Sequence, residues 1–333
     1  MRFEAFRTAG AAANRLFFFL FLFFPSGWCI LAPMNNAEGK GMYGWLIHNR
    51  FFFTQAFRDQ TESFLSASAA RGIRLEALSN AEARVRLTGP DGGERPDFAL
   101  FWDKDLPLAR DLESTGLPVF NSASAVWLCD DKILTFQALR GTGIRMPETV
   151  PVPFSFSGVC WDEEPFVDAA ASRLGYPLVI KAAHGSFGQQ VWLAENRTEL
   201  VARLNALSPE PALLQRFVAS SAGRDMRLYV VGDSVPAAMI RSSDRDFRAN
   251  IALGGNGEPF APGREETEIA LRACSALGLT FGGVDLLFGE DGHPVLCEVN
   301  SNAHVWNLSR LSGVDLADRI LAEVLRRLEE TGR

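Results

Sequence analysis

The segment from Gly283 to Asn302 reads GVDLLFGEDGHPVLCEVNSN and contains two short apolar runs. Between them lies an Asp-Gly dipeptide at 291–292, which is typical of a two-residue turn in a β-hairpin. With this turn, Asp285 lies directly opposite Glu298. Asn300 projects from the same face as Glu298, because side chains alternate along a strand. The segment therefore predicts a hairpin on which these three polar side chains converge.

Two carboxylates that face each other on apolar strands need compensation. Like charges opposite each other on a sheet repel, and the flanking valines and leucines make desolvation costly. A hard cation removes both problems, since Mg²⁺ and Mn²⁺ prefer oxygen ligands. The pattern therefore indicates a metal site formed by Asp285, Glu298 and Asn300. It also suits the solvated outer face of an edge hairpin, so both interpretations stay open from these residues alone.

The composition is that of a globular protein with more than one domain. The chain has 333 residues, 47% of them hydrophobic, and this length indicates two or three domains. A formal net charge of −7 argues against a general nucleic-acid binder, which is usually basic. The five cysteines form no CxxC pair, which favours reduced thiols over a disulfide framework. We therefore expect a cytoplasmic protein that binds no nucleic acid.

Residues 1–41 are an apolar leader of doubtful status. Arginines precede nine apolar residues at 16–24, an arrangement that resembles a signal peptide. The run is too short to span a bilayer, and a Pro-Ser-Gly triplet follows it. Three interpretations compete: translation that starts at Met34 or Met42, a membrane-proximal anchor, or a secretory signal. We favour the internal start and expect no membrane association.

Downstream of the leader, short apolar runs alternate with helical spacings, which is typical of a small parallel sheet. A long helix over 124–139 and an irregular proline-rich segment follow this first region. Further apolar runs predict strands and hairpins, including a hairpin that turns at Gly232-Asp233. The expected strands cover 43–49, 73–78, 97–103, 117–122, 176–183, 191–196 and 212–218, and the other expected helices cover 54–71, 106–114, 162–174, 198–207, 264–277 and 315–330.

Two lysines and a glycine-containing loop suggest phosphate binding. Lys181 ends an apolar strand, and Lys132 lies on the expected helix after two aspartates. The loop HGSFGQQ follows Lys181, and its glycines let backbone N–H groups approach a phosphate or close over one as a lid. Each feature also has an ordinary interpretation: solvated or snorkelling lysines, and a flexible hairpin turn.

Backbone groups and arginines complete the candidate set. The strand end QRFV, from Gln215 to Val218, offers backbone groups that can read an adenine edge, although core packing explains it equally well. Arg227 shares a strand face with Asp225, and Arg241 and Arg248 follow. Arginines beside a metal site favour a phosphate or carboxylate ligand, because guanidinium groups bind these in a bidentate manner. Surface salt bridges are the alternative.

Taken in order, the motifs DDK, VIKAAHGSFGQQV, QRFV, GRDMRLYVVGD, DFRAN, GGVDLLF and CEVNSN resemble the ATP-grasp superfamily, specifically the RimK-type amino-acid (alpha-L-glutamate) ligases. The resemblance covers roughly 43–324. It implies an α/β (α+β ATP-grasp) fold with a small parallel α/β pre-ATP-grasp domain at 42–127. A central ATP-grasp subdomain with the glycine loop at 128–210 and a C-terminal one with the metal hairpin at 211–333 would follow, both with mixed or antiparallel sheets.

The resemblance also implies roles for particular residues. The metal ligands would be Asp285, Glu298 and Asn300, holding Mg²⁺ or Mn²⁺, and the catalytic arginines would be Arg227, Arg248 and Arg241. The ATP site would comprise Lys132, Lys181, His184, Gly185, Ser186, Gly188, Gln215, Arg216, Phe217, Val218, Asp225 and Asn250. Arg216 and Ala219-Ser220 stand where similar proteins usually carry acids, which leaves the ribose contact unassigned.

The implied reaction joins a carboxylate to an amine with ATP hydrolysed to ADP, through an acyl phosphate. The expected partners are glutamate or a similar amino acid and an amine acceptor, which is a small molecule, peptide or protein. His304 follows the metal strand and is a candidate base for the amine, although a structural histidine is the preferred interpretation. The alternatives are an ATP-grasp kinase and a non-catalytic nucleotide-binding scaffold. Self-association is left open.

If translation starts internally, a protein that begins at Met42 is expected to fold and to have the ATP turnover of the full chain. Sedimentation and an ADP-release assay of the two forms would check this. Aggregation of the shorter form, together with a full-length chain that is active in membranes, would show that the leader has a role.

Overall fold

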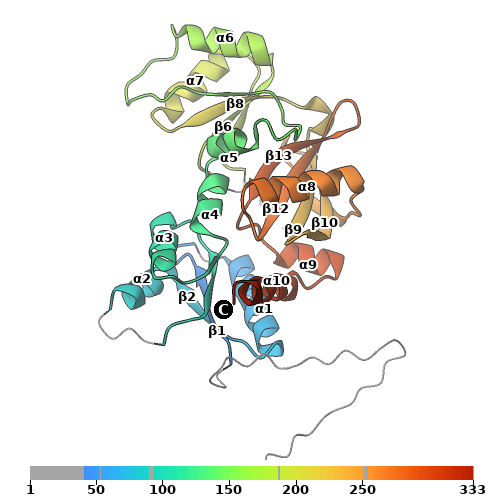
Figure 1. The fold of residues 1–333 in the computed structure, drawn as a ribbon. Coiled ribbons are helices and arrows are strands. Elements are labelled where there is room, and N and C mark those ends of the chain that lie inside the picture. Colours follow the sequence, from blue (N-terminus) through green and yellow to red (C-terminus); the bar gives the residue numbers. More distant parts are fainter. Residues whose placement is uncertain (1–40, 53, 90–93, 187, 251–253, 333) are drawn as a thin grey trace, which may run out of the picture.

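A computed structural model of the chain describes residues 41–52, 54–89, 94–186, 188–250 and 254–332. Nearly all of the leader lies outside these ranges. The strands form three sheets, and Figure 1 shows the N-terminal sheet at the bottom, the C-terminal sheet in the middle and the central sheet at the top. Within the ranges given, no helix has the length and apolar character needed to cross a membrane.

The N-terminal sheet is parallel, with the strand order β2-β1-β3-β4, as the alternation of strands and helices predicts. Sequence reasoning missed the second helix, although Ser79 and Glu82 form a capping box at its start. The strands are β1 (Tyr43–His48), β2 (Arg74–Ser79), β3 (Phe98–Trp102) and β4 (Val119–Phe120), and the helices are α1 (Gln55–Ala70), α2 (Asn80–Thr88) and α3 (Leu106–Ser114).

The single helix predicted over 124–139 is wrong. Two helices, α4 (Ala123–Asp130) and α5 (Lys132–Leu139), are separated at Asp131, whose backbone is extended. The Asp131 carboxylate caps α5 by accepting hydrogen bonds from two backbone N–H groups of its first turn. The break makes Lys132 the first residue of α5, and its N–H donates to the carbonyl of Ala183, beyond β6 of the central sheet.

The central sheet is antiparallel, with the order β5-β8-β6-β7, and two helices cover it. Because β8 pairs with β5 and β6, the chain leaves this sheet only after Arg216, beyond residue 210 where we expected the boundary. The strands are β5 (Thr149–Pro151), β6 (Leu178–Ala182), β7 (Val191–Ala194) and β8 (Ala212–Arg216), and the helices are α6 (Pro165–Leu174) and α7 (Arg197–Leu207).

The C-terminal sheet is also antiparallel, with the order β11-β10-β9-β12-β13, and it contains the two predicted hairpins. Helix α8 packs on it, and α9, which the sequence analysis missed, follows β13. The elements are a 3₁₀ turn (Ala219–Ser221), β9 (Arg224–Val231), β10 (Ser234–Ser242), β11 (Asn256–Pro259), α8 (Arg264–Ala276), β12 (Phe281–Phe288), β13 (Pro294–Asn300), α9 (Trp306–Ser312) and α10 (Leu316–Glu330).

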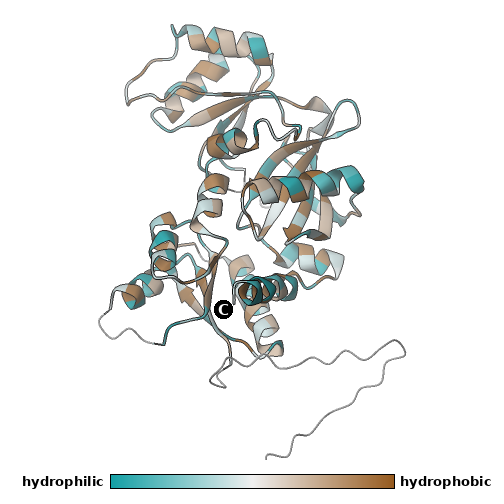
Figure 2. Ribbon diagram, in the orientation of Figure 1, coloured by the Kyte–Doolittle hydropathy of each residue, from teal (hydrophilic) through white to brown (hydrophobic). Residues whose placement is uncertain are grey.

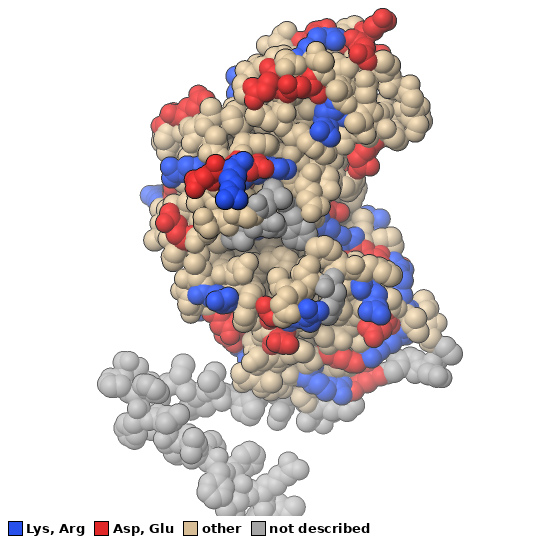
Figure 3. Space-filling model, turned by 180° about the vertical axis from the view of Figure 1, so that it is seen from behind, with Lys and Arg blue, Asp and Glu red and all other residues tan. Residues whose placement is uncertain are grey.

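The two ends of the chain share one hydrophobic core. Helix α10 packs against α1, and its apolar face joins one face of the N-terminal sheet to the back of the C-terminal sheet. In this core, the Trp102 ring stacks on Phe281 with a centroid distance of 5.1 Å. Figure 2 shows apolar strands within the layers and polar residues on the outer side of α10. On the described surface in Figure 3, basic and acidic side chains are interspersed.

Asn121, directly after β4, connects the same two sheets by hydrogen bonds. It is fully buried, and its Nδ2 donates to the carbonyls of Phe281 at 2.9 Å and Ser301 at 3.0 Å. Its Oδ1 accepts from the N–H of Thr280 at 2.8 Å. The N-terminal sheet is therefore held against the open end of the β12–β13 hairpin, opposite its turn, and this hairpin carries the acidic residues singled out in the sequence.

Replacing Asn121 with Ala should lower the free energy of unfolding by roughly 2–4 kcal/mol, because several buried backbone groups lose their partner together. Urea unfolding followed by circular dichroism measures this. Asn256→Ala, on the exposed edge strand β11, is the matched control and should change stability little. Equal unfolding midpoints for the two variants would contradict a role for Asn121 in joining the sheets.

Candidate active site

The β12–β13 hairpin pairs Asp285 with Glu298, as the sequence predicts, but the predicted turn is wrong. Phe288 pairs with Pro294, so the connecting loop is longer than the two residues expected at Asp291-Gly292. A bulge at Cys297 then absorbs the extra residue, since the pairing shifts by one on that strand between the turn and Asp285. The two deviations cancel, and the expected acidic pair is formed.

Asp285 lies at the centre of a buried ion-pair network that spans three strands. Arg227 on β9 donates from Nε to Oδ1 and from Nη2 to Oδ2 of Asp285, both at 2.5 Å. Arg241 on β10 donates from Nη2 to Oδ2 of Asp285 at 2.9 Å and forms a bidentate pair with Asp225. Arg241 and Asp285 are each only 3% exposed. Two arginines and two aspartates thus neutralise one another inside the sheet.

The network sets the charge state of Asp285. Burial by itself raises the pKa of this carboxyl, but the charges of Arg227 and Arg241 outweigh it and lower the pKa to about 2. Arg241 was expected among the catalytic residues, and the structure places it in this network. Its contacts are with two aspartates, so Arg241 holds Asp285 in position and keeps it ionised.

Glu298 is the most open carboxylate of this group, since Asp225 and Asp285 line only one of the cavities. It lines three cavities of the site, and among the described residues no side chain donates a hydrogen bond to it. The buried Nδ2 of the neighbouring Asn300 likewise has no partner within the described part of the chain. Asn250 lines two of the same cavities. The uncommitted Glu298 and Asn300, beside an ionised Asp285, fit a divalent cation with oxygen ligands.

Lys132 and Lys181 converge on Glu298 from two elements. Both line a small cavity together with Glu298 and Gln215. Lys132 Nζ donates to the carbonyl of Gly185 at 3.3 Å, and burial lowers the pKa of this lysine while the charge of Glu298 opposes the shift. Lys181 is buried, with its Nζ 3.7 Å from Sγ of Cys297. The break in the helix at Asp131 is what brings Lys132 here.

The glycine loop joins β6 to β7 and is anchored at both ends. Ser186 N–H donates to Oε1 of Gln190 at 3.2 Å, and that side chain fills the space in which a Cβ at Gly185 would lie. Arg248 Nη1 donates to the carbonyl of Gly188 at 2.5 Å, which links the loop to the segment after β10. The loop residue Phe187 lies outside the described residues.

Two of the other expected site residues, His184 and Arg248, form contacts that the sequence analysis did not predict. His184 is half exposed, lines none of the cavities described for this site, and has its Nδ1 3.5 Å from Oε1 of Glu210. Arg248, expected at the transferred phosphate, forms an ion pair with Asp246 in addition to its contacts with the loop. Arg248 still lines the cavity that lies between the central and C-terminal sheets.

That cavity has an apolar part and a basic part. Phe217 and Phe247 meet edge to face there, with ring centroids 6.1 Å apart, and Val218 and Leu287 add apolar surface. Sequence reasoning missed Phe247 and Leu287, because nothing local marks them as facing β8. Arg216, which stands at a position where an acid was expected, pairs with Glu148. A flat apolar group such as a purine suits the apolar part, and a phosphate chain suits the basic part.

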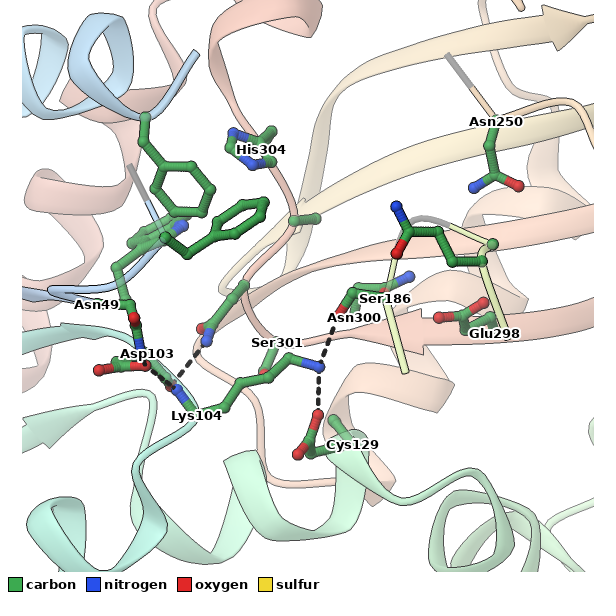
Figure 4. Close-up of a pocket in the computed structure, with 18 of the residues that line it drawn as sticks. Asn49, Asp103, Lys104, Cys129, Ser186, Asn250, Glu298, Asn300, Ser301 and His304 are labelled. Atoms are coloured by element: carbon green, nitrogen blue, oxygen red, sulfur yellow. Dashed lines mark hydrogen bonds and ion pairs between the residues drawn. The ribbon is translucent and has the colours of Figure 1, made fainter. Parts of the chain in front are cut away.

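A second cavity, of about 370 Å³, lies between the N-terminal sheet and the end of β13. Figure 4 shows Asn49, Asp103 and Lys104 on one side of it and Glu298 and Asn250 on the other. Asn49 follows β1, and Asp103 and Lys104 follow β3. Sequence reasoning missed these three, although polar residues at the carboxyl ends of parallel strands are a recognisable signal for ligand binding.

His304 lines this second cavity, and its ring packs edge to face on Phe57 with a centroid distance of 4.4 Å. Burial, with a contribution from the charge of Arg227, lowers the pKa of His304 to about 4. A neutral imidazole with this pKa is a weak base near pH 7. The surroundings of His304 therefore favour the structural interpretation over the catalytic one.

Two antiparallel sheets that enclose a cavity, next to a small parallel sheet, form the fold of the ATP-grasp ligases. The RimK domain protein of ATP-grasp type from Sphaerobacter thermophilus matches with a TM-score of 0.63 and 26% identity, over 84% of this chain and 98% of that one. A family profile described as the RimK-like ATP-grasp domain matches residues 129–324. The chain belongs to the RimK-like ATP-grasp family, whose members are ATP-binding ligases.

Curated relatives agree with this assignment. Identity is 36% to human N-acetylaspartylglutamate synthase A over 60% of this chain and 50% of the relative. Identity is 30% to a probable alpha-L-glutamate ligase of Parasynechococcus marenigrum, over 79% of this chain and 59% of the relative. An uncharacterized protein of Mycoplasma pneumoniae is 30% identical over 84% of this chain and 98% of the relative. The chain thus spans between half and three-fifths of the length of the two relatives that have a named activity.

The two acids of the hairpin should respond differently to neutralisation, although the sequence alone suggests that either change leaves the fold intact. Asp285→Asn leaves two buried arginines short of a negative charge and should destabilise the protein by about 3–5 kcal/mol. Glu298→Gln is isosteric, breaks no contact among the described residues, and should cost about 0.5 kcal/mol. Parallel urea titrations compare the two. Equal stability of both variants would contradict the structural role given to the network.

Proposed function

We propose that this protein is an ATP- and Mg²⁺-dependent ligase that forms an amide between a carboxylate and an amine, with glutamate or a similar amino acid as one substrate. The observation that carries the proposal is the position of Glu298. It lines the cavity that suits a nucleotide and also the cavity against the N-terminal sheet. A nucleotide with its phosphates toward Glu298 therefore has a second binding cavity directly beside those phosphates.

Within this proposal the residues take the following roles. Phe217, Phe247 and the backbone at Gln215 to Val218 hold the base, and Lys132 and Lys181 contact the phosphates. Asp285, Glu298 and Asn300 would hold Mg²⁺, which supplies positive charge to the phosphate oxygens when it is bound. Arg248 keeps the glycine loop, including Gly185, Ser186 and Gly188, in place near the phosphates.

The proposed chemistry needs cations and positioning but no nucleophilic side chain. A carboxylate oxygen of one substrate attacks the γ-phosphorus of ATP, the bond to the ADP oxygen breaks, and an acyl phosphate forms. The lone pair of the amine then attacks the acyl carbon, phosphate leaves, and the nitrogen loses a proton. Lys132, Lys181 and Arg227 surround the region where negative charge develops, and each such contact supplies roughly 2–4 kcal/mol of transition-state stabilisation.

The names of the relatives support glutamate as one substrate. N-acetylaspartylglutamate synthase and alpha-L-glutamate ligase both name it. In the first name an aspartyl acyl group is joined to glutamate, which puts glutamate on the amine side of the bond. We therefore propose glutamate as the amine, whereas the sequence analysis had glutamate added to an amine. A cytoplasmic location, with ATP and reduced thiols, goes with this function.

Wild-type protein with ATP and Mg²⁺ should release ADP only when both an amino acid and a carboxylate partner are present, and mass spectrometry should detect the amide. The assay uses glutamate, aspartate and glutamine against a panel of acylated amino acids, hydroxy acids and peptides. Glu298→Gln should abolish turnover while it lowers the free energy of unfolding by only about 0.5 kcal/mol.

Three results would count against the proposal. Release of ADP with a phosphorylated product and no amide indicates a kinase. Wild-type rates in Glu298→Gln remove the metal assignment. A folded protein that releases no ADP with any member of the panel indicates a nucleotide-binding scaffold.

A further inference from the structure

Lysine is rare in this chain and is concentrated at the site. Only four of its 33 basic residues are lysines, and arginine occupies the other basic positions. Lys40 lies outside the described residues, and the other three all line the cavities. Lysine offers a compact ammonium group, whereas arginine presents a wide planar fork, so the two are not interchangeable at a ligand. In a chain that uses arginine almost everywhere else, the three described lysines are therefore concentrated at the cavities.

Two of these lysines, Lys132 and Lys181, already have a proposed role at the phosphates. The third, Lys104, lines only the second cavity, which lies away from the base-binding residues. It is the second residue after β3 in the parallel sheet. Ligands of α/β folds bind at the carboxyl ends of such strands, because the loops there converge on one edge. The position of Lys104 therefore points to the second substrate and not to the nucleotide.

The contacts of Lys104 hold its ammonium group in the cavity. Its Nζ forms an ion pair with Asp130 and donates to Oγ of Ser186 at 3.0 Å, and Figure 4 shows the side chain extended toward Ser186. These partners come from the end of α4 and from the glycine loop. An ammonium group has three N–H donors, and two have partners among the described residues. The side chain is 42% exposed, so the third donor is accessible to a ligand.

The other cation of this cavity is differently placed. Arg227 makes its bidentate pair with the buried Asp285, and its side chain is 14% exposed. It therefore cannot leave Asp285 without uncovering a buried charge. The ion pair of Lys104 with Asp130 is partly exposed on both sides, so the ammonium group can bind a ligand through its third donor without uncovering a buried charge. Among the described residues that line the cavity, Arg227 is thus tied to Asp285, whereas Lys104 can bind an anionic group.

We propose that Lys104 is a specificity residue. It binds a carboxylate of the amino-acid substrate, and this carboxylate takes no part in the reaction. This inference rests on the proposed function and narrows it, because it assigns the second cavity to a dicarboxylic amino acid. The side-chain carboxylate contacts the ammonium group of Lys104, and the amine points toward Glu298 and the phosphates. Asp130 and Ser186 hold the ammonium group in place for the incoming carboxylate.

The test compares L-glutamate with L-glutamine, which has the same shape without the side-chain charge. In the ADP-release assay, Lys104→Met should lower kcat/KM for glutamate about 10- to 100-fold, mostly through KM, because a charged hydrogen bond is lost. The value for glutamine should change less than about threefold. Lys104→Arg keeps the charge but not the compact ammonium group, so it should lower kcat/KM for glutamate less than Lys104→Met does and should keep the preference for glutamate over glutamine.

Arg84→Met is the matched control. Arg84 has the same exposed fraction, 42%, and pairs with Asp105, the neighbour of Lys104, but it does not line the cavity. The Arg84→Met substitution should leave kcat/KM for glutamate and for glutamine unchanged. Equal losses for glutamate and glutamine in Lys104→Met, or loss of the preference in Lys104→Arg, would show a structural role and overturn the proposal.

A binding measurement separates this proposal from the proposed function. Calorimetry of L-glutamate with the full chain, Mg²⁺ and a non-hydrolysable ATP analogue does not depend on turnover. Binding to the wild type that is at least tenfold weaker in Lys104→Met supports the role of Lys104 even if no amide is formed. Equal binding by both proteins, or no binding of glutamate to the wild type, overturns it, whatever ADP release shows.

Discussion

The candidate site depends on the buried network of Arg227, Arg241, Asp225 and Asp285. Four charges at 14% side-chain exposure or less are tolerable only because each cation faces an anion at hydrogen-bond distance. The pairs join β10, β9 and β12, so they tie the strand order of the C-terminal sheet to the chemistry of the site. Because Asp285 is neutralised from the sheet side, Glu298 is the carboxylate that stays available to the cavities.

The three sheets are connected so that Glu298 lines each of the cavities of the site. Asn121 and the stacked Trp102 and Phe281 hold the N-terminal sheet against the β12–β13 hairpin. The break at Asp131 directs α5 toward the central sheet, and Arg248 links the glycine loop to the C-terminal sheet. A nucleotide cavity and a substrate cavity that share one wall follow from these few contacts. In the function proposed here, this shared wall would let an activated group pass between two substrates.

Much of the fold could be read from the sequence, because the period of apolar residues and the turn residues are local signals. They failed where a tertiary contact decided the outcome. The helix over 124–139 reads as continuous, but the Asp131 carboxylate caps a new helix there. The sequence predicted a two-residue turn at Asp291-Gly292, whereas the loop in the structure is longer. Asp285 and Glu298 still pair because the bulge at Cys297 compensates for the difference. The capping box of α2 was a local signal that could have been used.

By itself, the sequence determined the fold class and the family, since ordered motifs and strand periodicity are encoded along the chain, and it also predicted a group of acids, lysines and arginines as site residues. Only the tertiary structure decided which charged side chains form ion pairs with one another and which stay available to a ligand. Arg241 and Glu298 both line a cavity, but Arg241 is almost fully buried and paired with two aspartates, whereas Glu298 lines three cavities and accepts no side-chain hydrogen bond within the described part of the chain. Lys104 is 28 residues before Lys132 and was not singled out by any motif. The role proposed for Lys104 depends on the glycine loop of the central sheet, which lies beside it, and no local pattern encodes this proximity.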